Sequence, residues 1–202
     1  MKRLLLLLVA LATAGIVHAE SYRIYYITTK PHDIDDAIFW GFFKDEASFG
    51  AAINKGHLIV KQMVSVQLDS KGLGATDQTY SLTYPQSYDK LGKPQEFTKR
   101  KIGATARIEK LPDGRFDITY EFTALETWIF YGPGTQFSQP VFKTMATTTK
   151  TSLNRGFSPQ PLGGVLGVSN STSKDPSGLT TNDSSAYLFV IQQIPDAAFF
   201  PQ

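Results

Sequence analysis

The sequence has no cysteine. This excludes disulfide bonds, a thiol nucleophile, thiolate metal ligands and a lipid anchor on an N-terminal cysteine. Without covalent cross-links the folded state must depend on a hydrophobic core, and a chain of 202 residues is long enough to bury one. The length suits one domain of ordinary size.

Histidine is scarce, with three in the chain, and the common catalytic motifs are absent. His32 lies in the polar segment Lys30–Asp36, which lacks the twelve-residue loop of a calcium-binding hand and the paired histidines of a zinc helix. We interpret this segment as a solvated helix start capped by Asp33. No nucleophile elbow or phosphate-binding glycine loop occurs, and nothing singles out one serine for a Ser–His–Asp triad. The sequence therefore predicts no enzyme, no cofactor and no metal site.

The N-terminus carries the longest apolar run, Leu4–Ala14, which follows Lys2 and Arg3. Val17–Ala19 is a small-x-small cleavage site, so residues 1–19 are predicted to be a signal peptide. An uncleaved anchor is less favoured, because the run is shorter than the ~20 residues that a spanning helix needs. A cysteine-free exported protein fits the periplasm or outer membrane of a Gram-negative-type bacterium.

Removal of this leader changes the charge balance. It takes away two basic residues and no acidic ones, which leaves eighteen basic against eighteen acidic residues. The mature chain is then formally neutral and has no overall basic field for phosphate groups. We therefore expect no nucleic-acid partner.

The remaining residues, 20–202, alternate between strand patterns and turn residues. They predict a single α+β domain, mostly antiparallel β-sheet, with one or two short helices near its N-terminus. Lys44–Asn54 is predicted to be a helix with Asp45 as N-cap and Gly56 as stop. Strands are predicted over Tyr22–Thr29, Leu58–Leu68, Thr79–Tyr84, Phe97–Ile108, Arg115–Phe122, Val141–Leu153 and Ala186–Ile194.

Three segments carry more specific signals. Leu111–Gly114 predicts a hairpin turn, and the alternation in Arg115–Phe122 predicts a half-buried strand with one wet face. The basic run Lys99–Lys101 favours a solvated sheet edge, because charged side chains block unwanted strand pairing. The Ser/Thr-rich segment Ser169–Ser185 has the composition of a mobile loop.

A series of short motifs occurs in a fixed order between residues 84 and 166: Tyr84-Pro85, a strand that contains Gly103, the turn Pro112-Asp113-Gly114, then Pro140 and Phe142, and Gly163-Gly164. This order resembles the C-terminal core of the secretins, the outer-membrane channels of type II and III secretion and type IV pili. The resemblance implies a structural role in the fold for these residues of the motifs: Tyr84, Pro85, Gly103, Pro112, Asp113, Gly114, Pro140, Phe142, Gly163 and Gly164. Gly103, inside a predicted strand, indicates a bulge or a close backbone approach.

The chain differs from the family pattern at three places. The small ring domains that precede the core are missing, and Asn154–Ser158 replaces the family's Asp-Gly-Gln-Thr motif. The insertion between Phe122 and Val141 is short. A truncated, divergent secretin-like protein is therefore expected, acting as a subunit or accessory of the secretion machinery by β-sheet pairing rather than as an independent channel.

The expected partners are other copies of the chain or secretin subunits, bound through edge strands. Contact with the outer membrane stays open. The alternative function is a monomeric periplasmic or secreted binding module, in which the aromatic residues Trp128, Phe130 and Tyr131 form the ligand surface. The same residues are also candidates for membrane contact or for ordinary core packing.

Overall fold

A computed structural model describes residues 20–30, 37–132, 137–153, 156, 158–162, 167–174 and 180–195. Three predictions lie outside the described residues: the signal peptide, the polar cluster around His32, and the motif residues Gly163 and Gly164. Among the described residues, no helix is long and apolar enough to cross a membrane.

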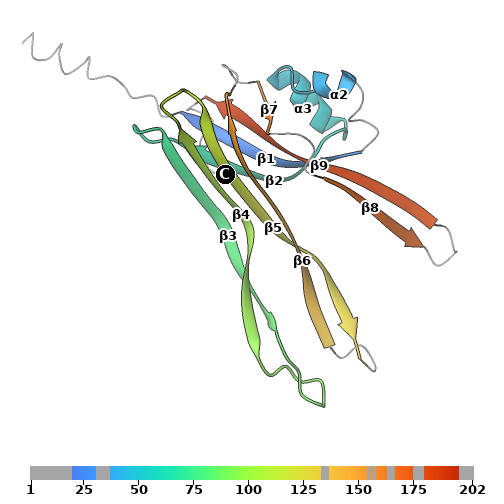
Figure 1. Cartoon of the computed structure of the whole chain (residues 1–202). Coiled ribbons are helices and arrows are strands. Elements are labelled where there is room, and N and C mark those ends of the chain that lie inside the picture. Colours follow the sequence, from blue (N-terminus) through green and yellow to red (C-terminus); the bar gives the residue numbers. More distant parts are fainter. Residues whose placement is uncertain are drawn as a thin grey trace, which may run out of the picture.

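The described chain is mostly antiparallel strand with two short helices, so the predicted α+β class is confirmed (Figure 1). The elements in chain order are β1 Ser21–Thr29, α2 Ala37–Gly41, α3 Glu46–Asn54, β2 Ile59–Gln67, β3 Leu73–Pro85, β4 Phe97–Lys110, β5 Phe116–Tyr131, β6 Phe137–Thr151, β7 Gln160–Pro161, β8 Gly167–Lys174 and β9 Thr180–Ile194.

These strands form two sheets. The first, sheet A, has the order β2-β1-β9-β7, and β8 also pairs with β9. The second, sheet B, is a meander in the order β3-β4-β5-β6. Every pairing is antiparallel. The meander follows from short turns between consecutive strands, such as the predicted hairpin at Leu111–Gly114.

The main core lies between the two sheets. From β1 it takes Ile24 and Tyr26, and from sheet B it takes Ile108, Ile118 and Tyr120, all of them buried. Burial of a side chain of this size contributes roughly 1.5–3 kcal/mol. The alternation predicted for Arg115–Phe122 is confirmed, because its apolar members face this core and its polar members face solvent.

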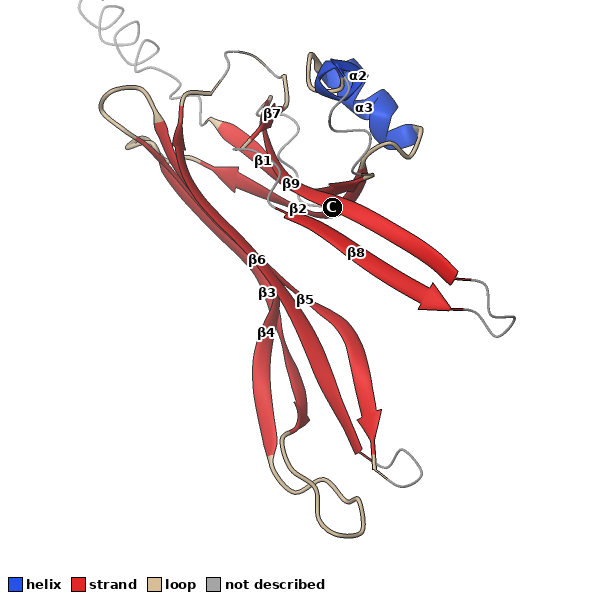
Figure 2. Ribbon diagram, turned by 45° about the vertical axis from the view of Figure 1, so that its right-hand side comes forward, coloured by secondary structure: helices blue, strands red, loops and turns tan. Residues whose placement is uncertain are grey.

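The helices cover the other face of sheet A (Figure 2). Tyr25 and Ile27 of β1 pack there against Phe39 of α2 and Phe49 of α3. Strand β1 is thus buried on both faces, which explains why its sequence shows no polar alternation. The predicted start of α3 is confirmed, since the carboxylate of Asp45 accepts a hydrogen bond from the Ser48 N–H at 2.7 Å.

The structure corrects two predictions, the end of the strand at Phe122 and the loop over residues 169–185. Strand β5 does not end at Phe122 but continues through Tyr131, paired with β6. A register shift between Leu125 and Thr127 explains the miss, because a bulge interrupts the two-residue alternation that marks a half-buried strand.

The predicted loop over residues 169–185 is wrong as well. β8 and β9 pair from Gly167↔Tyr187 to Lys174↔Thr180 and form a long hairpin. Composition alone cannot reveal this, because strand formation depends on context, and sheet A already anchors the Ala186–Ile194 part of β9. The mobility of this segment stays a prediction.

Candidate functional site: the forked end of sheet B

Sheet B divides into two hairpins along its length. β4 and β5 pair only from Lys110↔Phe116 to Gly103↔Thr123. β3 and β4 stay paired as far as Pro85↔Phe97, and β5 and β6 as far as Tyr131↔Phe137. Beyond Gly103 the four-stranded sheet therefore becomes two separate hairpins, β3–β4 and β5–β6 (Figure 2). We call this part of the molecule the fork.

Gly103 lies where the sheet divides. Its φ is +120°, a conformation that other residues rarely adopt. A Cβ atom there would meet the carbonyl oxygen of Gln78 and lie 3.0 Å from the Cα of Thr79. The structure therefore shows the close backbone approach that the sequence indicates. The pairing of β3 with β4 runs through Thr79↔Gly103 without a shift, so the position is not a bulge between these strands.

The fork leaves two strand edges unpaired. In the described chain, no strand pairs with the inner edge of Phe97–Ile102 in β4 or of Ala124–Tyr131 in β5. Each edge presents backbone N–H and C=O groups that another strand could bind. The basic run Lys99–Lys101 lies on the β4 edge, as expected for a protected edge.

Two of the predicted motif residues meet in the fork. The rings of Tyr84 in β3 and Phe142 in β6 lie 5.5 Å apart, although β3 and β6 are the outer strands of the sheet. The guanidinium of Arg100 lies 4.7 Å from the centre of the Phe142 ring. This contact links the β3–β4 hairpin with the β5–β6 hairpin.

A second contact joins the hairpins nearer the tip. The Tyr88 hydroxyl donates a hydrogen bond to the Ser138 carbonyl oxygen at 2.7 Å, and it accepts one from the Ser138 N–H at 3.2 Å. The Tyr88 ring also packs on Phe137, with 5.1 Å between centroids, and Phe137 stacks on Tyr131 at 5.4 Å. The two hairpins are therefore fastened through side chains, not through backbone pairing.

The predicted aromatic cluster does not form one surface. Consecutive strand residues point to opposite faces, so Phe130 and Tyr131 lie on different sides of β5. Trp128 is half-buried and pairs with Pro140, whereas the side chain of Phe130 is 60% exposed. Tyr131 stacks on Phe137. Trp128 and Phe130, two residues apart, share one face of β5, so a ligand or membrane contact at these residues stays a prediction.

The motif Pro112-Asp113-Gly114 lies at the opposite end of sheet B, as the turn between β4 and β5. The Leu111 N–H donates to the Arg115 carbonyl at 2.7 Å, and Gly114 has a φ of +82°. Hydrogen bonds from the Arg115 guanidinium and N–H hold the pKa of Asp113 below its ordinary value. This motif is a structural turn.

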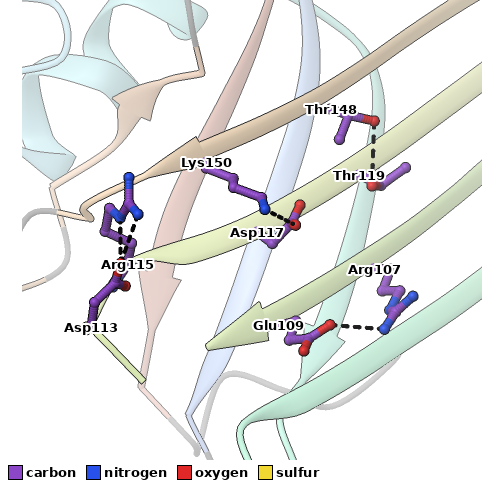
Figure 3. Close-up of polar contacts among 8 residues, drawn as sticks. All are labelled: Arg107, Glu109, Asp113, Arg115, Asp117, Thr119, Thr148 and Lys150. Atoms are coloured by element: carbon purple, nitrogen blue, oxygen red, sulfur yellow. Dashed lines mark hydrogen bonds and ion pairs between the residues drawn. The ribbon is translucent and has the colours of Figure 1, made fainter. Parts of the chain in front are cut away.

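The outer face of sheet B is polar and exposed (Figure 3). Its contacts are ion pairs and hydroxyl pairs between neighbouring strands, such as Lys150–Asp117 at 3.6 Å and Thr119–Thr148 at 3.4 Å. Exposed pairs of this kind contribute about 0–1 kcal/mol each. The described residues contain no group of three or more His, Asp or Glu that could hold a metal ion.

Sequence reasoning missed Arg100, Tyr88 and Phe137 as contributors to the fork. Tyr88 lies outside every strand predicted from the sequence, and Arg100 is one member of the basic run Lys99–Lys101. Their contacts join elements about fifty residues apart, and no local pattern signals such a pairing.

Comparisons with known proteins give a distant match. No family model matches the chain, and no curated protein matches it either. Among solved structures, it is similar to the Salmonella SPI-1 type III secretion injectisome secretin InvG, with 9% identity and a TM-score of 0.35; the match covers 100% of this chain and 72% of that one. It is also similar to a chain in the basal body of InvG, PrgH and PrgK, with 9% identity, a TM-score of 0.35 and 51% of that chain covered. This is a distant similarity in structure to secretins, and it assigns neither a role nor a partner to this chain.

Proposed function

We propose that the protein is a non-enzymatic envelope protein, a subunit or accessory of an outer-membrane secretion or pilus machinery, that acts by pairing strand edges with its partners. The partners are other copies of the chain or secretin subunits. The site of pairing is the fork of sheet B.

One observation carries this proposal. β4 and β5 separate at Gly103↔Thr123, and the inner edges of Phe97–Ile102 and Ala124–Tyr131 lie without a strand partner among the described residues. Exposed edges of this length are pairing templates that monomeric proteins usually cover, shorten or charge. Only the β4 edge carries a basic run, and the β5 edge carries the single charge of Glu126.

The motif order supports the same function. Tyr84, Gly103 and Phe142 belong to the residues that resemble the secretin core, and all three lie in or at the start of the fork. The predicted signal peptide supports export, which an envelope machinery requires.

The physical mechanism is β-augmentation. An added strand supplies donors and acceptors to the open edge, and each new backbone hydrogen bond contributes about 0.5–1.5 kcal/mol net. The exposed side chains of Phe97, Ile129 and Phe130 next to these edges add apolar area that a partner can bury. Specificity comes from the side chains that face the incoming strand.

The test measures the mass of the mature protein by light scattering, both from the periplasm and from detergent-extracted outer membrane. The proposal predicts an assembly, either of this chain alone or with a secretin, that co-fractionates with the envelope. A soluble monomer that associates with no secretin would contradict it and would favour the binding-module alternative.

A further inference from the structure

A second open edge lies far from the fork, on the β8–β9 hairpin. β1 pairs with β9 only between Ala186 and Ile194. Past Ala186, Ser169–Lys174 and Thr180–Ser185 pair only with each other among the described residues. Figures 1 and 2 show this part of the hairpin projecting beyond both sheets. We call it the arm.

The arm gains little stability from its own sequence. Its residues are mostly Ser, Thr and Asn, whose side chains have little apolar area. A two-stranded ribbon without a covering layer is marginally stable in water. Pairing with a further strand would therefore stabilise the arm more than it would stabilise a strand inside the sheets.

The outer edges of the two sheets differ in how they are protected. β2 carries Lys61, β3 carries Asp77, β6 carries Lys143 and Lys150, and the short β7 contains Pro161. Charged residues and proline are the usual means of blocking strand addition. In contrast, Gly167–Ser173 of β8 contains neither a charged residue nor proline. Among the described outer edges, β8 carries its single charge at its last residue, Lys174, and leaves the rest of its edge without such protection.

We propose that β8 of one copy pairs antiparallel with β8 of a second copy, about a two-fold axis that joins the arms of both chains. A two-fold contact requires an edge that is complementary to itself. If the axis passes beside Ser171, this residue lies opposite its equivalent in the second copy, and Val168 lies opposite Lys174. No like charges then oppose each other, and the serine pairs are compatible with cross-strand hydrogen bonds.

This inference rests on the proposed function, because it adds a second pairing edge to the same protein. It assigns separate contacts to the two edges: β8 joins two copies about a two-fold axis, and the fork remains open for further copies or secretin subunits.

The first test is the substitution Ser171→Lys, with Ser171→Thr as the matched control. Lysine on the edge places a charge beside its equivalent in the second copy, whereas threonine keeps a small hydroxyl residue. We expect Ser171→Lys to weaken dimerisation at least tenfold, about 1.4 kcal/mol, and Ser171→Thr to leave it unchanged. Both variants should keep the melting temperature measured at low concentration, because the arm projects from the fold.

The second test uses the absence of natural cysteine. A nitroxide attached to Asn170→Cys reports the distance between the two copies by pulsed electron paramagnetic resonance. Neighbouring strands are about 4.8 Å apart, so paired β8 strands bring the two labels into the shortest measurable range. A label on Lys93→Cys, in the turn between β3 and β4, should give a longer distance in the same dimer.

The outcomes separate the two proposals. Dimerisation of equal strength in Ser171→Lys and Ser171→Thr, or a long distance between labels at position 170, would overturn the β8 contact and leave the function of the fork untouched. A monomeric protein that still binds a secretin would also overturn the β8 contact alone. A monomer that binds no secretin would overturn both.

Discussion

The two halves of sheet B consist of the same four strands but behave differently. In the half from Gly103 to Lys110 of β4, sheet A covers the inner face, and Ile108 and Tyr120 are fully buried. In the fork no second sheet covers the strands, and Tyr80, Phe97 and Phe130 are at least 60% exposed. Pairing between β4 and β5 stops where Gly103 pairs with Thr123. The comparison indicates that a covering layer keeps the four strands together, and that the uncovered half is available for a partner.

The largest expected effect comes from a substitution in the covered half. Tyr120→Ala leaves a cavity between the sheets, and we expect the free energy of unfolding to fall by roughly 3–5 kcal/mol. The matched substitution in the fork, Phe130→Ala, should change it by less than about 1 kcal/mol, because an exposed side chain gains little from folding. Urea unfolding of both variants checks this. Equal losses would mean that the fork is as firmly packed as the core.

The next effect is expected at the point of division. Gly103→Ala forces an unfavourable φ and a contact with the Gln78 carbonyl, so we expect a loss of about 1–3 kcal/mol in the free energy of unfolding. Gly114→Ala is the control, because it also has a positive φ but has open space around it. Thermal unfolding should give a lower melting temperature for Gly103→Ala than for Gly114→Ala. The reverse order would show that the close approach at Gly103 relaxes without cost.

A smaller effect is expected from the contact that fastens the hairpins. Tyr88→Phe keeps the ring on Phe137 but removes the hydroxyl from Ser138, which should cost about 0.5–1.5 kcal/mol locally. Hydrogen exchange of the Ser138 amide should become faster, while global stability changes little. Tyr80→Phe, on an exposed ring in β3, should have no effect. Unchanged exchange in Tyr88→Phe would argue against a fastened fork.

The smallest expected effect is a pH dependence at the end of the molecule opposite the fork. Burial opposes ionisation of Glu20, but hydrogen bonds from Lys110 and Tyr22 outweigh it and lower the pKa of its carboxyl below its ordinary value. The carboxylate therefore contributes stability that is present above its unfolded pKa and is lost as pH falls through the lower folded value. The free energy of unfolding is measured between pH 6 and pH 3 for the unchanged protein and for Glu20→Gln. It should fall slightly more steeply with decreasing pH in the unchanged protein. Parallel curves would contradict this.

The sequence predicted the covered half well. Three local features were predicted and are present in the structure: the alternation in Arg115–Phe122, the helix cap at Asp45 and the turn at Leu111–Gly114. The fork was harder to predict, because Trp128–Tyr131 is uniformly apolar and follows a bulge, so its pattern did not identify a strand. Contacts such as Tyr84 with Phe142 depend on how two hairpins lie in space, which local patterns do not encode.

The arm shows the limit of composition as evidence. Ser169–Ser185 has the composition of a mobile loop, yet its described residues belong to β8 and β9. The Ala186–Ile194 part of β9 pairs with β1 and β7 in sheet A, and the strand continues from there into Thr180–Ser185. The strand conformation of the arm therefore follows from its connection to sheet A and could not be inferred from its Ser/Thr-rich composition.

The central claim is that the inner edges of the fork are pairing surfaces. Hydrogen exchange of the amides of Phe97–Ile102 and Ala124–Tyr131, compared between the isolated protein and its envelope assembly, tests it most directly. The account predicts that amides facing the inner edges exchange fast in isolation and become protected in the assembly, while those of Ala104–Ile108 stay protected in both. Fast exchange of the inner edges in an intact assembly would contradict the claim.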